Sequence, residues 1–213
     1  MTGILEGIRV VDMGHVVAVP AACAMLGDWG AEVIKVEPLT GDMLRGLKRM
    51  QVVDGQLVTR EDATHWYVNL LNRSKRGVAL DLKKEAGREI LNRLVQRADV
   101  FVSNYEVDAL KRLKCDYASL SQINPRLVYG VLTGYGTVGP DKDERGFDFA
   151  AGWARTGAQY LIGEPGTAPP PQRGGMMDRV TGGYIVAAVL AALLNRERTG
   201  RGQEIEFSLY HTG

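Results

Sequence analysis

Short β-rich runs alternate along this chain with segments of helical periodicity, and this alternation limits the fold more than any other feature. Strands separated by helices are typical of βαβ units, which bury a parallel sheet between helices. Six runs have the composition of strands: 8–11, 32–37, 78–82, 100–103, 127–132 and 204–209. We therefore predict an α/β fold with a mostly parallel sheet of five or six strands and helices on both faces.

The segments between these runs divide into helices and loops. Residues 21–29, 84–98 and 180–197 have helical spacing, and residues 147–156 are compatible with a helix. The 180–197 segment is apolar nearly all round, so we expect it to be among the most buried helices. Residues 39–64 lack a clean period and are predicted to be irregular, and the Gly/Pro-rich residues 163–175 are predicted to form a loop. With no repeat or linker, residues 1–213 are predicted to form a single domain.

Charge and composition exclude several classes of function. The 26 basic and 25 acidic residues nearly cancel, whereas a nucleic-acid-binding surface needs a basic excess. The longest apolar run, Ile185–Leu194, is about half of what a bilayer crossing needs, and no signal-peptide pattern opens the sequence. The two cysteines, Cys23 and Cys115, are too few for a disulfide framework. Together with only three histidines, they are also too few for a zinc cluster. We expect a cytoplasmic protein that binds neither nucleic acid, membrane nor metal.

Two features could carry chemistry, and the residues alone leave both open. The strand, turn and helix start over residues 10–20 could bind phosphate through free N–H groups, or could be a purely structural turn. Asp178 follows a flexible loop and precedes a buried helix. It could cap that helix, or it could be a carboxylate nucleophile. The charged run 142–145 is typical of a solvated loop.

Five blocks of the sequence resemble the class III CoA transferases, the family of formyl-CoA transferase and carnitine CoA transferase. They are LEGIRVVDMGHVVAVP, LGDWGAEVIKVEP, NRSKRGVALDLKK, NPRLVYGVLTGYGTVGP and MDRVTGGYIVAAVLAALLNRERTGRGQEIEFSLY, at residues 5–20, 26–38, 72–84, 124–140 and 177–210. The last block is the most specific, because an Asp, a small-residue helix and a TG-x-GQ turn recur in order. The resemblance implies a Rossmann-like CoA-binding domain, the N-terminal half of such an enzyme, without the family's small second domain.

The same resemblance implies roles for individual residues. Asp178 matches the nucleophile, which would attack an acyl-CoA thioester to give an aspartyl anhydride and pass CoA to a carboxylic acid. CoA would be bound as a substrate, without a metal. The positions matching the family's contacts to CoA are Val17, Ala18, Leu80, Asp81, Lys83, Asn104, Tyr105, Arg112 and Arg145. Lys and Arg suit the phosphates of CoA, and an aromatic or apolar wall suits its adenine.

Several positions depart from the family pattern. Val17 replaces the Gln of formyl-CoA transferases, which argues against an oxalate-type polar acceptor site. Pro38 replaces a residue that is basic in some members and cannot bind phosphate. Glu106 follows Tyr105 where a proline-glycine is usual, and a glutamate near the pyrophosphate would be unfavourable. The sequence is also about half the family's length, so we expect the family's loop that excludes water from the active site to be absent from residues 1–213.

Two alternatives to a CoA transferase follow from these departures. Racemases of α-methylacyl-CoA share the fold and most of the blocks, but they use a His where this chain has Phe147, and phenylalanine cannot move a proton. A truncated domain that binds CoA without turnover is the second alternative. Whichever function applies, we expect surface that the other half of the family fold normally covers to be buried in a homodimer or against a complementary C-terminal chain.

Overall fold

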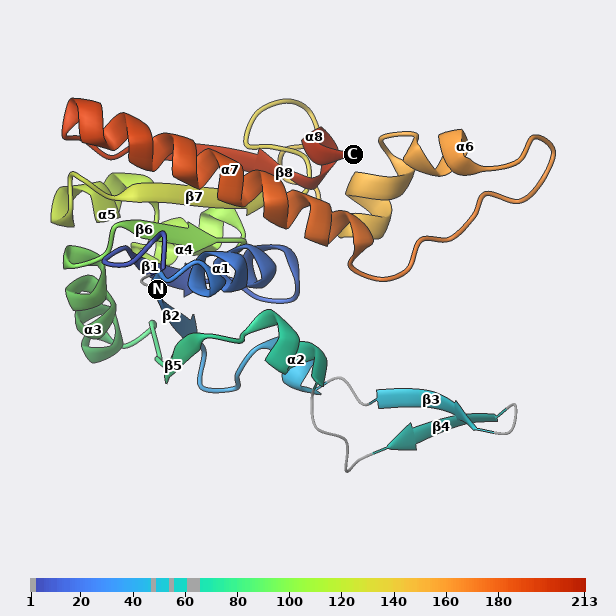
Figure 1. Cartoon of the computed structure of the whole chain (residues 1–213), viewed down its shortest axis with the longest axis horizontal. Coiled ribbons are helices and arrows are strands. Elements are labelled where there is room, and N and C mark those ends of the chain that lie inside the picture. Colours follow the sequence, from blue (N-terminus) through green and yellow to red (C-terminus); the bar gives the residue numbers. More distant parts are fainter. Residues whose placement is uncertain (1–2, 47–48, 54–55, 61–65) are drawn as a thin grey trace.

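A computed structural model describes residues 3–46, 49–53, 56–60 and 66–213, and its centre is a six-stranded sheet (Figure 1). The strand order is β5-β2-β1-β6-β7-β8, and every neighbouring pair is parallel. The strands are β1 (Arg9–Met13), β2 (Glu32–Glu37), β5 (Lys75–Ala79), β6 (Val100–Ser103), β7 (Val128–Thr133) and β8 (Glu204–Ser208). The predicted α/β fold with a parallel sheet is confirmed.

Helices cover both faces of the sheet, as predicted. On one face, α1 (Ala18–Asp28) and α7 (Met176–Thr199) share a core with Val10 and Val102. On the other, α3 (Glu85–Gln96), α4 (Val107–Leu113) and α5 (Tyr117–Ile123) share a core with Val11 and Phe101. Neighbouring strand residues thus point to opposite faces, and both faces are apolar, as a doubly covered parallel sheet requires.

The remaining elements are short. They are η1 (Met43–Gly46), β3 (Arg49–Val53), β4 (Gln56–Arg60), α2 (Trp66–Leu71), the π-helix η2 (Asp148–Ala154), α6 (Ala158–Ile162) and α8 (Leu209–Thr212). Figure 1 shows η2 and α6 at the end of the molecule where α7 begins and where the chain reaches its last residue. The expected helix over 147–156 is therefore present as η2.

The chain reverses direction across the sheet between β1 and β6. From β1 it adds β2 and then β5 on one side, and it returns to place β6, β7 and β8 on the other. Ligands of open α/β sheets bind in the crevice outside the carboxyl ends of the strands at such a switch point. The fold therefore directs attention to the loops that follow β1, β6 and β7.

Two buried ion pairs support the loop after β1. Lys75 Nζ lies 2.7 Å from Asp12 Oδ2 and also donates a hydrogen bond to the Pro20 carbonyl oxygen. Lys35 Nζ donates a 2.7 Å hydrogen bond to the Gly14 carbonyl oxygen and lies 3.4 Å from Asp42 Oδ2. All four charged side chains are at most 2% exposed, so the turn that follows β1 is tied to β2, β5 and the 42–44 segment.

Two predictions for the first half are wrong. Residues 39–64, expected to be irregular, contain η1 and the antiparallel pair β3–β4. The missed signal is the Asp54-Gly55 dipeptide between the two strand sequences, which is typical of hairpin turns. The third strand covers Lys75–Ala79 rather than 78–82, because the buried Lys75–Asp12 pair allows a polar-looking sequence to join the sheet.

The long helix also differs from the expectation. It begins at Met176, so Asp178 lies inside its first turn, and only one face of the helix is buried. Val180, Tyr184 and Leu194 on the opposite face are exposed. By length and apolar composition alone α7 could cross a membrane. Its inner face, however, packs against α1, β7 and β8, as a core helix of a layered domain does.

Candidate active site

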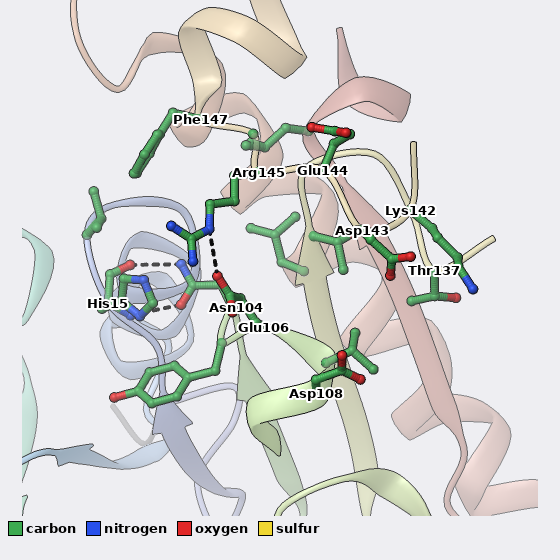
Figure 2. Close-up of a pocket in the computed structure, with 18 of the residues that line it drawn as sticks. His15, Asn104, Glu106, Asp108, Thr137, Lys142, Asp143, Glu144, Arg145 and Phe147 are labelled. Carbon is green, nitrogen blue, oxygen red and sulfur yellow. Dashed lines mark hydrogen bonds and ion pairs between the residues drawn. The ribbon is translucent and has the colours of Figure 1, made fainter. Parts of the chain in front are cut away.

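A cavity of about 740 Å³ opens at the switch point of the sheet (Figure 2). Its walls come from the loops after β1, β6 and β7, the start of α4 and the first turn of α7. Of the residues predicted to contact CoA or to act as nucleophile, those lining it are Val17, Asn104, Tyr105, Arg145 and Asp178. Residues from four separate parts of the sequence therefore meet in one cavity.

The loop after β1 is held in an unusual conformation at the edge of this cavity. His15 N donates a 2.9 Å hydrogen bond to Asn104 Oδ1, and Asn104 Nδ2 donates one of 2.9 Å to the His15 carbonyl oxygen. Val16 has a φ of 64°, a left-handed conformation that costs a β-branched residue energy. Its N–H donates to Asp42 Oδ1 at 3.3 Å. The predicted contact residue Asn104 thus positions the loop as well as lining the cavity.

Aromatic side chains form part of one wall. The rings of His15 and Tyr105 meet edge to face with their centroids 5.0 Å apart. Burial lowers the pKa of His15, and the positive charge of Lys35 acts in the same direction, while Asp42 opposes them. His15 is therefore a neutral ring at neutral pH. The wall it forms with Tyr105 is suited to an apolar or aromatic part of a ligand.

The 142–147 segment crosses the cavity from the β7 side. Gly134 and Gly146 make this approach possible, since a Cβ on Gly134 would lie 2.9 Å from the Gly146 Cα. Arg145 Nε lies 3.1 Å from Glu106 Oε1, and Figure 2 shows the two side chains pointing toward one another. The lining contains the cations Lys111, Lys142 and Arg145, and the carboxyl groups Glu106, Asp108, Asp143, Glu144 and Asp178. Glu106 therefore partly neutralises the arginine predicted to bind a phosphate.

Asp178 is the buried carboxyl group of this cavity. Its side chain lies in the first turn of α7, whose N-cap is Gly175 with a φ of 74°, so Asp178 does not cap the helix. Burial, together with the negative charge of Asp148, raises the pKa of Asp178 to about 7, although Arg179 acts to lower it. The start of a helix favours the ionised form of a carboxyl group, and burial and the charge of Asp148 act against it here.

The side chain of Arg179, the neighbour of Asp178, bonds to residues other than Asp178. Its Nη2 donates a 3.1 Å hydrogen bond to the Tyr67 hydroxyl, and its guanidinium carbon lies 5.4 Å from the centre of the Tyr67 ring. Its Nη1 donates to the Gly175 carbonyl oxygen at 3.4 Å. Arg179 therefore connects α7 to α2, and it lies close enough to Asp178 to moderate the charge of that carboxylate without forming an ion pair with it in the part of the chain that the structure describes.

The other predicted contacts lie outside the cavity. Ala18 is buried in the first turn of α1, beside Val17. Leu80 is buried in the core under α3, and Asp81 Oδ1 accepts the Lys83 N–H in the turn before that helix. Lys83 and Arg112 are exposed. Since β5 is an edge strand separated from β6 by β2 and β1, the Leu80–Lys83 group is not brought to the cavity. The assignment of these five residues to CoA stays a prediction.

Residues outside the predicted set also contribute to the site. Lys111 and Lys142 line the cavity and add positive charge, and Phe147 adds an exposed aromatic ring. Asp148 is buried, and its negative charge raises the pKa of Asp178. Lys142 was assigned to a solvated charge run, and Lys111 precedes the predicted Arg112 by one residue. In the sequence, Asp148 could have been noticed as the last residue of the Gly146-Phe147-Asp148 triplet, which follows the GYG loop.

Comparison with known proteins identifies relatives along the whole chain. The profile of the family described as CoA-transferase family III matches residues 5–213. The (R)-2-hydroxy-4-methylpentanoate CoA-transferase of Clostridioides difficile is 39% identical over 210 residues, which are 98% of this chain and 51% of that protein. The cinnamoyl-CoA:phenyllactate CoA-transferase of Clostridium sporogenes is 36% identical over 211 residues, 99% of this chain and 50% of that protein.

Solved structures agree with these sequence relatives. A CAIB/BAIF family protein from Brucella suis superimposes with a TM-score of 0.89 at 36% identity, covering 100% of this chain and 55% of that one. A Mycobacterium tuberculosis protein gives a TM-score of 0.86 at 32% identity, covering 99% of this chain and 56% of that one. The chain thus spans about half the length of the relatives it matches.

Proposed function

Because this chain belongs to CoA-transferase family III, we propose that it carries the nucleophile and part of the CoA site of an enzyme that transfers CoA from an acyl-CoA thioester to a carboxylic acid. The observation that carries this proposal is the position of Asp178. It is a buried carboxyl group in the wall of a cavity at the switch point of a parallel sheet. The three cations of the cavity suit the phosphates of CoA, and the His15–Tyr105 wall suits its apolar or aromatic parts.

The proposed reaction uses Asp178 as a covalent acyl carrier. A carboxylate oxygen of Asp178 attacks the thioester carbonyl carbon, the C–S bond breaks, and CoA leaves as a thiolate. The thiolate then attacks the Asp178 carbonyl carbon of this mixed anhydride, which releases the donor acid and leaves an aspartyl-CoA thioester. The acceptor carboxylate attacks that thioester in turn, and the returning thiolate yields the new acyl-CoA and free Asp178. The burial of Asp178 supports this chemistry, because water must be kept from the anhydride.

The racemase alternative lacks a suitable base at the relevant position. Phe147 lines the cavity and is 62% exposed (Figure 2). Its ring carries no exchangeable proton, so a reaction that removes and returns a proton at carbon would lose one of its partners. A transferase needs only the carboxyl group and a bound thioester, which makes it the function that this site supports better.

We propose further that activity requires additional polypeptide. Relatives are about twice as long, and α7 exposes Val180, Tyr184 and Leu194 along one face. Large apolar side chains gathered on one face are typical of an interface. A second copy of this chain or a complementary C-terminal chain would cover them and complete the enclosure of Asp178.

The buried, free thiols of Cys23 and Cys115 support a cytoplasmic location.

Trapping the acyl-enzyme tests the proposal. The chain is incubated with an acyl-CoA and hydroxylamine, by itself and together with a polypeptide corresponding to the second half of the family. Peptide mass spectrometry should find a hydroxamate at Asp178, and Asp178→Ala should abolish it while CoA binding is retained. Asp143→Ala, which removes an exposed carboxyl group of the same cavity, should keep the label. Label on another residue, or no label in either mixture, would contradict the assignment.

A further inference from the structure

Val16 has a backbone conformation that its own side chain disfavours. Its φ is 64°, and the other non-glycine residues with a positive φ in the part of the chain that the structure describes are Ser74 and Lys114. Neither of those is β-branched, whereas a β-branched residue in this region is a true outlier. Such strain persists only where the surroundings enforce it, and it is frequent at functional sites. The group that holds Val16 is therefore of interest.

Asp42 is the side chain that holds Val16. Its Oδ1 accepts the Val16 N–H at 3.3 Å, and its Oδ2 lies 3.4 Å from Lys35 Nζ. Lys35 in turn donates a 2.7 Å hydrogen bond to the Gly14 carbonyl oxygen. The buried pair thus contacts the backbone of the loop on both sides of His15.

Stability alone does not account for this ion pair. The side chains of Lys35 and Asp42 are 2% and 1% exposed, and Asp42 Oδ2 has no hydrogen-bond partner among the described residues. Removing two charges from water costs free energy that is repaid only when the geometry is good and further hydrogen bonds form. Apolar residues of similar volume often stabilise a core equally well. A pair with an incompletely bonded carboxylate is therefore better explained by the backbone that it positions.

Val17, the next residue, connects this conformation to the nucleophile. It is 3% exposed and lines the cavity together with Asp178. Both of its γ-carbons lie 3.4 Å from the place of a Cβ on Gly175, and the Tyr67 hydroxyl lies 2.6 Å from the same place. Gly175 is the N-cap of α7. Val17 and Tyr67 thus enclose the residue from which the helix of Asp178 begins, and a rotation of the Val16 backbone would displace Val17 from this contact.

We propose that Asp42 is a positioning residue for the acylation of Asp178: it holds Val16 in the left-handed conformation and thereby keeps Val17 against the start of α7, where the reacting end of an acyl-CoA would lie. This inference rests on the function proposed above. Asp42 is not among the described residues that line the cavity, so it acts only through the loop. Its loss should slow acylation more than it weakens CoA binding, because a displacement of about 1 Å can cost about a hundredfold in rate.

Two variants without the ion pair test this role. Lys35→Met/Asp42→Asn and Lys35→Met/Asp42→Leu both remove the two charges together, so neither leaves one of them unpaired. Asparagine keeps an Oδ1 that can accept the Val16 N–H, whereas leucine has nearly the same shape and cannot accept it. Acylation is measured as hydroxamate formation at Asp178 with saturating acyl-CoA, and CoA binding by isothermal titration. The asparagine variant should react at least about tenfold faster than the leucine variant, with CoA affinities within about twofold.

Glycine at position 16 tests whether the effect passes through the backbone conformation. Glycine adopts a φ near 64° without strain, so a chain with Val16→Gly no longer needs the acceptor. Added to both variants, Val16→Gly should reduce the difference in rate to less than about threefold. It does not restore the Leu44 N–H bond to Asp42 Oδ1. A difference that persists with Val16→Gly, or equal rates of the two original variants, would therefore overturn the proposal.

An NMR measurement that needs no turnover separates this inference from the proposed function. A nuclear Overhauser effect between the Val17 methyl groups and the Gly175 α-protons should be present in the wild type and the asparagine variant and much weaker in the leucine variant. An unchanged effect in the leucine variant would overturn the proposal. A wild type in which this effect depends on the acceptor, but which forms no hydroxamate at Asp178, would refute the proposed function and not the hold of Asp42 on the loop.

Urea denaturation checks that the variants fold to the same extent. If the leucine variant does not fold, Lys35→Met/Asp42→Ala, which removes the acceptor without adding bulk, takes its place with the same expected rates. Rates that follow the folded fraction of each variant, rather than the presence of the acceptor, would show that Asp42 serves stability only and would overturn the proposal.

Discussion

The backbone of His15 and the side chain of Asn104 exchange two hydrogen bonds, each 2.9 Å long, between the loop after β1 and the loop after β6. These loops flank the switch point of the sheet, and both residues line the cavity (Figure 2). Asn104 is suited to this because its amide carries an acceptor and a donor, whereas the backbone of His15 offers the complementary pair. A residue assigned to ligand binding by resemblance therefore also has a structural task.

Replacement of Asn104 by alanine should reveal both roles. Losing two partly buried hydrogen bonds should lower the free energy of unfolding by about 1–3 kcal/mol. It should also weaken CoA binding, because the 15–17 loop lines the cavity. Urea denaturation and isothermal titration with CoA measure the two effects. Asn195→Ala, which removes an exposed bond to Gln203, is the control and should change neither quantity appreciably. Equal effects of the two variants would contradict this role for Asn104.

Glu106 competes with a ligand phosphate for Arg145. The two exposed side chains form an ion pair at 3.1 Å, and a phosphate bound to Arg145 must displace the carboxylate. Glu106→Gln should therefore tighten CoA binding by roughly two- to fivefold, the range expected for an exposed pair, with a smaller gain at high salt. Titration with CoA at two ionic strengths measures this. Glu89→Gln makes the same change of net charge on α3, outside the cavity, and equal affinities of the two variants would refute the competition.

The buried Lys75–Asp12 pair should be essential for stability. Burial by itself would raise the pKa of Asp12, but the charges of Lys75 and Lys35 more than offset it, so the pKa of Asp12 is lowered. Lys75→Met leaves this carboxylate with less compensation and should lower the free energy of unfolding by about 3–5 kcal/mol at pH 7. Arg76→Met, which breaks the adjacent exposed pair with Glu32, should cost less than about 1 kcal/mol.

The loss of stability caused by Lys75→Met should change with pH in a predictable direction. A lowered pKa means that the contribution of ionised Asp12 is present above the unfolded value of about 3.9 and is lost as pH falls through the folded value. The stability gap between wild type and Lys75→Met should therefore narrow below about pH 4. Urea denaturation from pH 3 to 7 measures it, and a gap that is constant over this range would show that the pair does not act through charge.

The same pair explains where sequence reasoning on the fold succeeded and failed. Strand alternation predicted the parallel sheet because the buried faces consist of local apolar runs such as Val100 to Val102. It misplaced β5, because Lys75 is polar in the sequence and becomes compatible with burial only through Asp12, 63 residues away. Lys35 in β2 is buried for a similar reason, through Gly14 and Asp42. Partners distant in the sequence are not visible to a local pattern.

For the candidate site, too, a local sequence pattern could not show the effect of residues distant in the sequence. The resemblance assigned ten residues to the nucleophile or to contacts with CoA, and five of them line one cavity. The protonation of Asp178 was not predictable from its place at a helix start, since the local dipole favours the charged form. Burial raises the pKa of Asp178, and so does the negative charge of Asp148, which lies 30 residues earlier in the sequence. Local geometry and tertiary electrostatics here act in opposite directions.

Asp178 should destabilise the protein when it ionises. Its folded pKa of about 7 lies above the ordinary value of 3.8, so its contribution to stability is fully present below the unfolded pKa and is lost as pH rises through 7. Asp178→Asn stays neutral at every pH and escapes this loss. At pH 8 the variant should be more stable than the wild type, by up to about 4 kcal/mol, and the difference should vanish below about pH 4.

Urea denaturation of wild type and Asp178→Asn at pH 4, 6 and 8 measures this difference. Asp143→Asn removes an exposed carboxylate from the same cavity and should follow the wild type at every pH. A group kept at a cost in stability is expected where function demands it, because a buried carboxyl group that is hard to ionise can be protected from water and close to a thioester at once. A wild type that equals or exceeds Asp178→Asn in stability at pH 8 would show that Asp178 ionises freely in the folded protein.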